Sequence, residues 1–185
     1  MKPSDAHSIR YVAFLRGINV GGHKKVSMAE LTKALEKAGF KNVQTLLNSG
    51  NILFDAPEDK TPHVAEKIEK IIEQSFGFHS NVIIRSVWDM QKLIDADPFG
   101  NIPMTDDTQL YVTFLAEAVT ATVKLPYKSP AGNFTILRAS NTEVCSVLVL
   151  EPTVQSTDAM KILEKSYGKN VTTRNWNTVL KLLKN

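Results

Sequence analysis

The chain has 185 residues, of which 43% are hydrophobic and 22% charged, and its formal net charge at pH 7 is +3. This composition predicts a globular protein with a substantial core, and the single cysteine, Cys145, excludes a disulfide scaffold and indicates a reducing compartment. The polar residues 1–8 and the lack of about 18 consecutive apolar residues predict a cytoplasmic protein with no membrane partner.

The first half of the chain predicts a ferredoxin-like unit. The expected elements, in order, are a strand over 9–15, a helix from Ser27 to Gly39, strands over 43–47 and 52–54, a helix from Thr61 and a strand over 82–85. A capping box opens the first helix, and the hairpin signal Asn48-Ser49-Gly50-Asn51 separates the two short strands. The order βαββαβ is the split βαβ unit, in which two helices cover one face of an antiparallel sheet.

A short helix over 86–95 and a linker over 97–103 lead into the second half. There, Tyr111-Val112-Thr113-Phe114-Leu115 resembles the first strand, Tyr11-Val12-Ala13-Phe14-Leu15, which favours an internal duplication. The predicted fold class is therefore α+β: a ferredoxin-like unit followed by a second, smaller and duplicated α+β unit. We expect a ferredoxin-like domain over 1–96 and a second α+β domain with basic C-terminal helices over 104–185.

The loop after the first strand, residues 15–25, is the best candidate for a site. Its glycines allow a ligand to approach the backbone, and its cations favour an anionic or phosphorylated small molecule. In the second half Ala116 follows the equivalent strand, and Arg138-Ala139-Ser140-Asn141 stands in place of the hairpin signal. Because this half lacks the glycines and the arginine, the fold does not require them. The candidate ligand-binding residues are Arg16, Gly17, Asn19, Gly21, Gly22, Lys24, Asn48, Asn51, Arg174 and Asn175.

Other features of this candidate site are less specific. The spacing from Gly17 to Gly22 resembles a Walker A loop, but that motif has lysine directly after the second glycine and then Ser or Thr. Here His23 intervenes before Lys24, and Lys25 takes the place of the hydroxyl residue. Turn formation alone also explains Asn48 and Asn51. We expect the loop and the hairpin to project from opposite ends of the sheet, so a shared site would need packing between the halves or between protomers.

The end of the chain is basic. From Asp158 onward six cations oppose two carboxylates, and the cations are Lys161, Lys165, Lys169, Arg174, Lys181 and Lys184. Trp176 shares a helical stripe with Val179, Leu180 and Leu183 and is predicted to be a core residue, while Asn175 is placed to cap that helix. Lysines on a helix are more often solvated than bound to phosphate.

Three segments resemble one family: residues 14–22, residues 47–52 and Thr172-Thr173-Arg174-Asn175-Trp176-Asn177-Thr178. Together they are similar to the bacterial domain of unknown function 1697 family. The resemblance implies an α+β fold with ferredoxin-like character and no established activity. The chain departs from similar proteins at Glu151–Met160, where those proteins often carry a glycine-rich segment that runs into Ser-Lys-Leu.

No catalytic constellation, metal-ligand spacing or cofactor motif is evident, so no metal or cofactor is expected. The residues 51–54 lack the pattern of an RNA-recognition strand, and both faces of the first strand are apolar, which argues against an open RNA platform. The sequence favours the hypothesis that a small anionic or phosphorylated ligand binds at the Arg16–Lys25 loop, with Lys24 and Arg174 in support. The alternatives are an enzyme acting on a nucleotide-like substrate, a nucleic-acid-binding module that uses the C-terminal helices, and a structural or interaction protein whose Arg16 braces the fold. The oligomeric state does not follow from the sequence.

Overall fold

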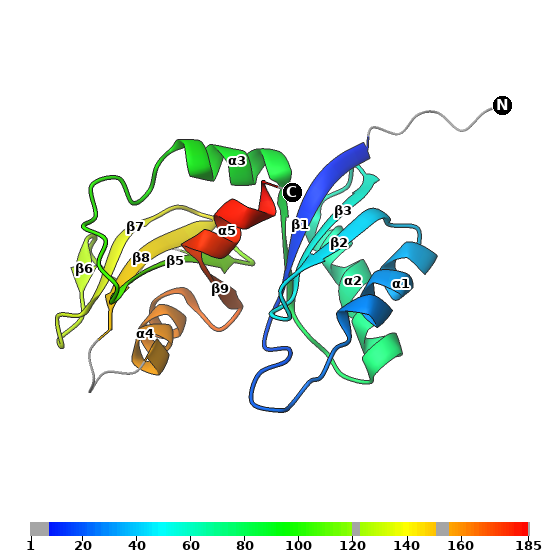
Figure 1. Cartoon of the computed structure of the whole chain (residues 1–185), viewed down its shortest axis with the longest axis horizontal. Helices are drawn as coiled ribbons and strands as arrows, with labels where there is room; N and C mark the ends of the chain where they lie inside the picture. The colour runs from blue at the N-terminus through cyan, green and yellow to red at the C-terminus, as the bar shows by residue number, and fades with distance from the viewer. Residues whose placement is uncertain (1–7, 120–122, 151–155, 185) are drawn as a thin grey trace. The chain divides into compact units, whose positions relative to one another are not determined.

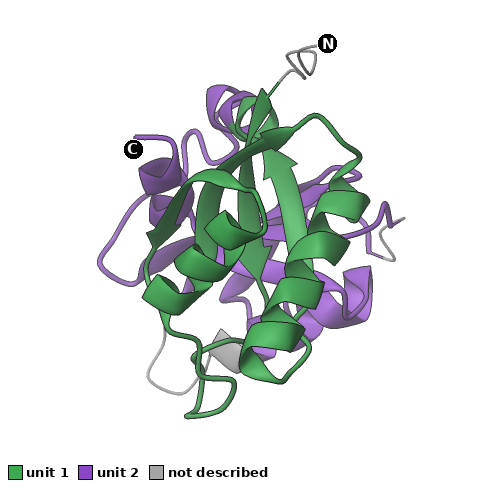
Figure 2. Cartoon of the chain, turned by 90° about the vertical axis from the view of Figure 1, so that its right-hand side faces the viewer, with its two compact units in different colours: residues 1–90 green, residues 91–185 purple. Residues whose placement is uncertain are grey.

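The computed structural model describes residues 8–119, 123–150 and 156–184 (Figure 1). Internal contacts divide the chain into two compact units, residues 1–90 and 91–185 (Figure 2). The domain boundaries expected at residues 96 and 104 stay predictions. None of the described helices is long and apolar enough to cross a bilayer. The polar start of the chain up to His7 and the residues 151–155 of the departing segment lie outside the described residues.

The first unit has the predicted ferredoxin-like order. Its elements are β1 (Ser8–Leu15), α1 (Met28–Lys37), β2 (Lys41–Leu46), β3 (Asn51–Pro57), α2 (Thr61–Phe76) and β4 (Val82–Ser86), followed by α3 (Val87–Asp95), which crosses the unit boundary. The sheet order is β2-β3-β1-β4, and every neighbouring pair is antiparallel. The mixed α+β class expected from the sequence is confirmed.

Local chemistry defines the helices of this unit. The Ser27 hydroxyl accepts a hydrogen bond from the Glu30 backbone N–H at 3.4 Å, which caps the start of α1. Pro62 stands in the first turn of α2, and Gly77, at φ +75°, ends that helix. Leu31 and Leu35 of α1 are fully buried in a core that also includes α2, and both helices lie on one face of the sheet (Figure 1).

The second unit holds a five-stranded antiparallel sheet. Its elements are β5 (Thr108–Leu115), β6 (Tyr127–Lys128), β7 (Phe134–Ala139), β8 (Glu143–Val149), α4 (Ser156–Tyr167), β9 (Val171–Asn175) and α5 (Trp176–Leu182). The sheet order is β6-β7-β8-β5-β9. Ala159, Leu163 and Tyr167 of α4 pack into the core on one face of this sheet.

The two units repeat one strand arrangement. β1 lies between β3 and β4, and β5 lies between β8 and β9, as the matching Tyr-Val-x-Phe-Leu strands predicted. The registers also agree: Leu15 pairs with Val82 and Leu115 with Val171. The predicted match of the hairpin residues is wrong by two positions. Phe14 pairs with Asn51 and Phe114 with Glu143, so Glu143, and not Asn141, is the counterpart of Asn51.

The core position predicted for Trp176 is only partly correct. Trp176 begins α5 and is half-buried, and its indole meets the Phe99 ring edge-on with centroids 5.1 Å apart. Val179 and Leu182 are the fully buried side chains of this helix. The predicted cap is confirmed, since Asn175 Oδ1 accepts from the Asn177 backbone N–H at 2.9 Å.

Candidate functional site: the loop cluster of the first unit

Three loops meet at one end of the first sheet (Figure 1). β1 is antiparallel to both β3 and β4, so its last residues lie beside the first residues of those strands. The Leu15 N–H donates to Gly50 O at 2.8 Å, and the Arg16 N–H donates to Asn81 O at 3.0 Å. Residues 16–27, 47–50 and 77–81 therefore form one group, the loop cluster. The expectation that the first loop and the hairpin project from opposite ends is wrong, because it overlooked the direction of β3 relative to β1.

Asn19 joins two of these loops. Its Oδ1 accepts from the Val26 N–H at 2.8 Å, and its Nδ2 donates to Val26 O at 3.0 Å and to Asn48 O at 2.8 Å. The amide thus closes the first loop on itself and fastens it to the hairpin. Val20 and Leu47, the residues next to this connection, expose 67% and 54% of their surface. Asn19, a predicted ligand residue, has a structural role here.

Lys24 joins the first loop to the third. Its Nζ donates to His79 O at 2.9 Å and lies 5.6 Å from the centroid of the Phe78 ring, a cation–π distance. His79 Nε2 lies 2.6 Å from Asn81 Oδ1 within the third loop. The ammonium group therefore fixes the loops and also contributes its positive charge to the cluster.

Packing explains two residues of the hairpin signal. Asn51 is fully buried, and its Nδ2 donates to Leu46 O at 2.9 Å and to Ser49 Oγ at 3.0 Å. Gly50 has φ +78°, and a Cβ added there would lie 2.8 Å from both Ile18 Cδ1 and Leu15 Cβ. Only glycine fits this position without a shift of the core. The turn interpretation of the signal therefore accounts for Gly50 and Asn51.

Several residues of the loop cluster adopt the left-handed backbone conformation, with positive φ. Gly17, Gly21 and Gly22 have φ values of +66°, +61° and +79°, and Asn19 and Lys24 adopt +54° and +49°. Leu47 is the least expected residue in this region, at φ +61°. A left-handed conformation costs a residue with a Cβ roughly 1–2 kcal/mol, so the surrounding contacts hold the loops in a conformation their residues do not prefer.

The charge of the loop cluster has one sign. Its residues include Arg16, Lys24 and Lys25 but no aspartate or glutamate. Arg16 is half-buried and Lys25 is exposed. An open cavity of about 650 Å³ lies beside the start of α1, lined by Asn19, Gly22, Lys25, Val26, Ser27, Met28, Glu30 and Asn48. Lys25 and Glu30 are the charged residues of this lining, and Glu30 belongs to the helix.

Arg174 and Asn175, the other predicted ligand residues, belong to the second unit. Arg174 pairs with Val112 in the sheet, as Arg85 pairs with Val12 in the first unit. The Nη1 of Arg174 donates to Thr173 O at 2.9 Å, and the Nη1 of Arg85 donates to Ile84 O at 2.7 Å, so each arginine bonds the carbonyl of its preceding residue.

Comparing the two units shows which arginine belongs to the shared strand arrangement and which is found in the first unit alone. Arg174 is part of a strand end that both units contain, and burial lowers the pKa of its guanidinium to about 10. Arg16 has no such counterpart. The Ala116 N–H donates to Asn170 O at 3.1 Å, as the Arg16 N–H donates to Asn81 O, so Ala116 occupies the position of Arg16 in the second unit. The strand end therefore does not need a guanidinium at this position.

Sequence reasoning missed residues 77–81 as part of the cluster. The sequence feature that could have indicated this loop is the polar stretch His79-Ser80-Asn81 between a helix and a strand. In the structure, Ser80 Oγ donates to Arg16 O at 3.0 Å. Among the described residues, no group of three or more His, Cys, Asp or Glu side chains is arranged to hold a metal ion. Cys145 is buried, and burial raises the pKa of its thiol to about 12, so the group is not a ready nucleophile.

The fold and the loop cluster define a two-unit α+β protein with a polar, cationic group of loops at one end of its first sheet. A family described as "Protein of unknown function (DUF1697)" matches residues 9–144, and the chain belongs to this family. The Thr172–Thr178 motif lies beyond the matched residues.

A solved structure, that of the conserved bacterial protein SP0830 from Streptococcus pneumoniae, is similar to the chain with a TM-score of 0.70 and 26% identity. The similarity covers 96% of this chain and 98% of that one. No curated protein matches.

Proposed function

We propose that the protein binds a small anionic or phosphorylated ligand at the loop cluster, through Arg16 and Lys25 and the backbone of Gly21 and Gly22. The observation that carries the proposal is the charge of the cluster: its first loop holds three cations, Arg16, Lys24 and Lys25, and none of its three loops contains a carboxylate. Cations gathered in this way attract anions, and the glycines let a ligand approach the main chain.

The comparison between the two units supports this proposal. Both units have the same register and the same backbone hydrogen bond at the end of the central strand, but only the first places an arginine there. A residue that one copy of a scaffold has and the other lacks is not required by that scaffold. The shared scaffold therefore does not require Arg16, which leaves this guanidinium available as a ligand residue of the first unit alone, whereas Asn19, Asn51 and Arg174 have structural hydrogen bonds.

Thermal unfolding with inorganic pyrophosphate tests the proposal, with chloride used to hold the ionic strength constant. The ligand at about 100 times its Kd is expected to add roughly 2.7 kcal/mol to the free energy of unfolding. Arg16→Ala and Lys25→Ala are each expected to remove most of this gain. Lys33→Ala, which removes an equal charge from the exposed face of α1, serves as the matched control and is expected to retain it.

The alternatives predict different outcomes of the same experiment. If Arg16 braces the fold, Arg16→Ala lowers the free energy of unfolding by roughly 3–5 kcal/mol, and pyrophosphate has no effect on either protein. As a ligand residue, Arg16 is expected to change stability by no more than about 0.5 kcal/mol. A nucleic-acid-binding module would bind an oligonucleotide with an affinity that falls steeply with salt, independently of Arg16.

A substitution at Glu30 provides a second test, in which the expected change in affinity has the opposite sign. Its carboxylate lines the cavity beside Lys25 and opposes an anion. Glu30→Gln is therefore expected to tighten pyrophosphate binding, whereas Arg16→Ala and Lys25→Ala weaken it. A loss of pyrophosphate binding in Glu30→Gln would contradict an anion site on this side of the loops.

A further inference from the structure

A groove with an apolar floor lies at the other end of the first unit. It occupies about 480 Å³ between the end of α1, the end of β3 and the first three turns of α2. Its lining consists of Ala38, Gly39, Phe40, Ala56, Pro57, Glu58, Asp59, Val64, Lys67, Lys70 and Ile71. Pro57, at the end of β3, pairs with Ser8 at the start of β1, so the groove is remote from the loop cluster at the end of β1.

The floor of the groove is part of the packed core. Phe40, Ala56 and Val64 expose 7%, 6% and 2% of their surface, so each presents only a small apolar area to a bound molecule. The Phe40 ring meets the Phe54 ring edge-on at a centroid distance of 5.0 Å, and Phe54 stacks on Tyr11 at 5.7 Å. The floor is therefore rigid, and its volume falls in the range of about 300–1,000 Å³ that small-molecule sites occupy.

Two lysines stand at the mouth of the groove, one turn apart on α2. Lys67 Nζ lies 3.3 Å from Asp59 Oδ2, and Lys70 Nζ lies 2.7 Å from Glu66 Oε1. The two lysine side chains are 63% and 65% exposed. Exposed ion pairs contribute only about 0–1 kcal/mol, so either ammonium group can exchange its carboxylate partner at little cost.

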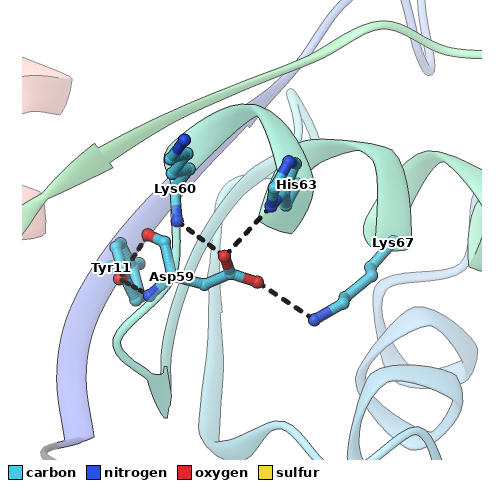
Figure 3. Close-up of polar contacts among 5 residues, drawn as sticks. All are labelled: Tyr11, Asp59, Lys60, His63 and Lys67. Atoms are coloured by element: carbon cyan, nitrogen blue, oxygen red, sulfur yellow. Dashed lines mark hydrogen bonds and ion pairs between the residues drawn. The ribbon is translucent and has the colours of Figure 1, made fainter.

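Asp59, which also lines the groove, is held in place by several contacts (Figure 3). Its carboxylate accepts from the Lys60 N–H at 2.8 Å, lies 3.1 Å from His63 Nδ1 and faces Lys67. These hydrogen bonds lower the pKa of the Asp59 carboxyl. The Tyr11 hydroxyl lies 3.3 Å from both the N and the O of the Asp59 backbone. The Asp59 carboxylate is thus already shared among several donors, whereas Glu66, the partner of Lys70, is 60% exposed.

We propose that this groove binds a monocarboxylic acid with an apolar body, whose carboxylate pairs with Lys70 and Lys67. The apolar body lies on Phe40 and Val64 and extends toward Ile71. A single negative charge suits the mouth better than a phosphate, because Glu58 and Asp59 also line it and would repel a dianion. The groove site is independent of the loop cluster and of the function proposed for it.

Isothermal titration of the full chain with 3-phenylpropanoate and with the uncharged 3-phenylpropanol tests this proposal. We expect the acid to bind at one site, about three- to tenfold more tightly than the alcohol, as two exposed charge contacts would give. The Lys67→Gln, Lys70→Gln double variant is expected to reduce the affinity for the acid to that for the alcohol. Lys33→Gln on α1 is the matched control and is expected to change neither affinity.

Two further measurements, on a groove-filling variant and with a competing anion, test whether the ligand binds in the groove. Ala38→Phe, which fills the groove from its exposed edge, is expected to weaken both compounds more than tenfold, and pyrophosphate is not expected to displace the acid. Equal affinities for the acid and the alcohol would overturn the role of the lysines. The groove would be ruled out as the site by any of three results: neither compound binds, Ala38→Phe leaves binding unchanged, or pyrophosphate displaces the acid.

Discussion

Replacing Gly50 with alanine tests how tightly the hairpin is held against the first loop. At φ +78° an alanine raises the free energy of the folded state by roughly 1–2 kcal/mol. About 0.4–1 kcal/mol of this is offset because alanine has less conformational entropy than glycine in the unfolded chain. The new Cβ would also lie 2.8 Å from Ile18 Cδ1 and Leu15 Cβ, both on fully buried residues. Overpacking of this kind costs typically 1–3 kcal/mol. We therefore expect Gly50→Ala to lower the free energy of unfolding by about 2–4 kcal/mol.

Gly77 provides the matched control for this substitution. It has φ +75°, nearly the same as Gly50, but an added Cβ would meet no atom within 4 Å. Gly77→Ala therefore includes the backbone term alone and is expected to cost about 1 kcal/mol. Urea unfolding followed by circular dichroism measures both variants, and the difference between them reports the packing of the hairpin on the first loop. Equal losses in the two variants would refute the close approach of Gly50 to Ile18 and with it the compactness of the loop cluster.

Two further predictions concern ionisable groups. Because burial raises the pKa of Cys145 to about 12, the native protein at pH 8 is expected to react with iodoacetamide only when urea unfolds it, and rapid labelling of the native protein would contradict this burial. Asp59 has a lowered pKa in the folded protein, so its contribution to stability is present above its unfolded pKa of about 3.9 and is lost as the pH falls through the folded value. The urea midpoint of Asp59→Asn should fall less between pH 5 and pH 2.5 than that of the wild type, and parallel curves would argue against the contacts in Figure 3.

Local sequence signals predicted the elements of the first unit well. Ser27 caps α1 and Gly39, at φ +98°, ends it as expected, because capping depends on neighbouring residues alone. The repeated Tyr-Val-x-Phe-Leu strand likewise predicted two central strands, since a strand with apolar residues on both faces favours the middle of a sheet.

The candidate site was harder to predict because it depends on strand direction. Asn19 and Asn48 lie 29 residues apart and meet only because β3 runs antiparallel to β1. No local pattern in the sequence indicates that Asn19 uses its amide to close a loop. The groove beside Phe40 was also not predicted, since its floor residues look like ordinary core positions and its lysines like solvated helix positions. Such sites arise from tertiary packing and not from motifs.

The shared register of the two units has a consequence for protein engineering. Backbone hydrogen bonds from residues 16 and 116 anchor the two central strands at matching points, so the connections that leave them start from the same geometry. A graft of the first loop and its hairpin would therefore meet compatible attachment points at Leu115 and Glu143 in the second unit. Such a chimaera would separate what the loops do from the scaffold that carries them, as gene duplication followed by loop divergence does in evolution.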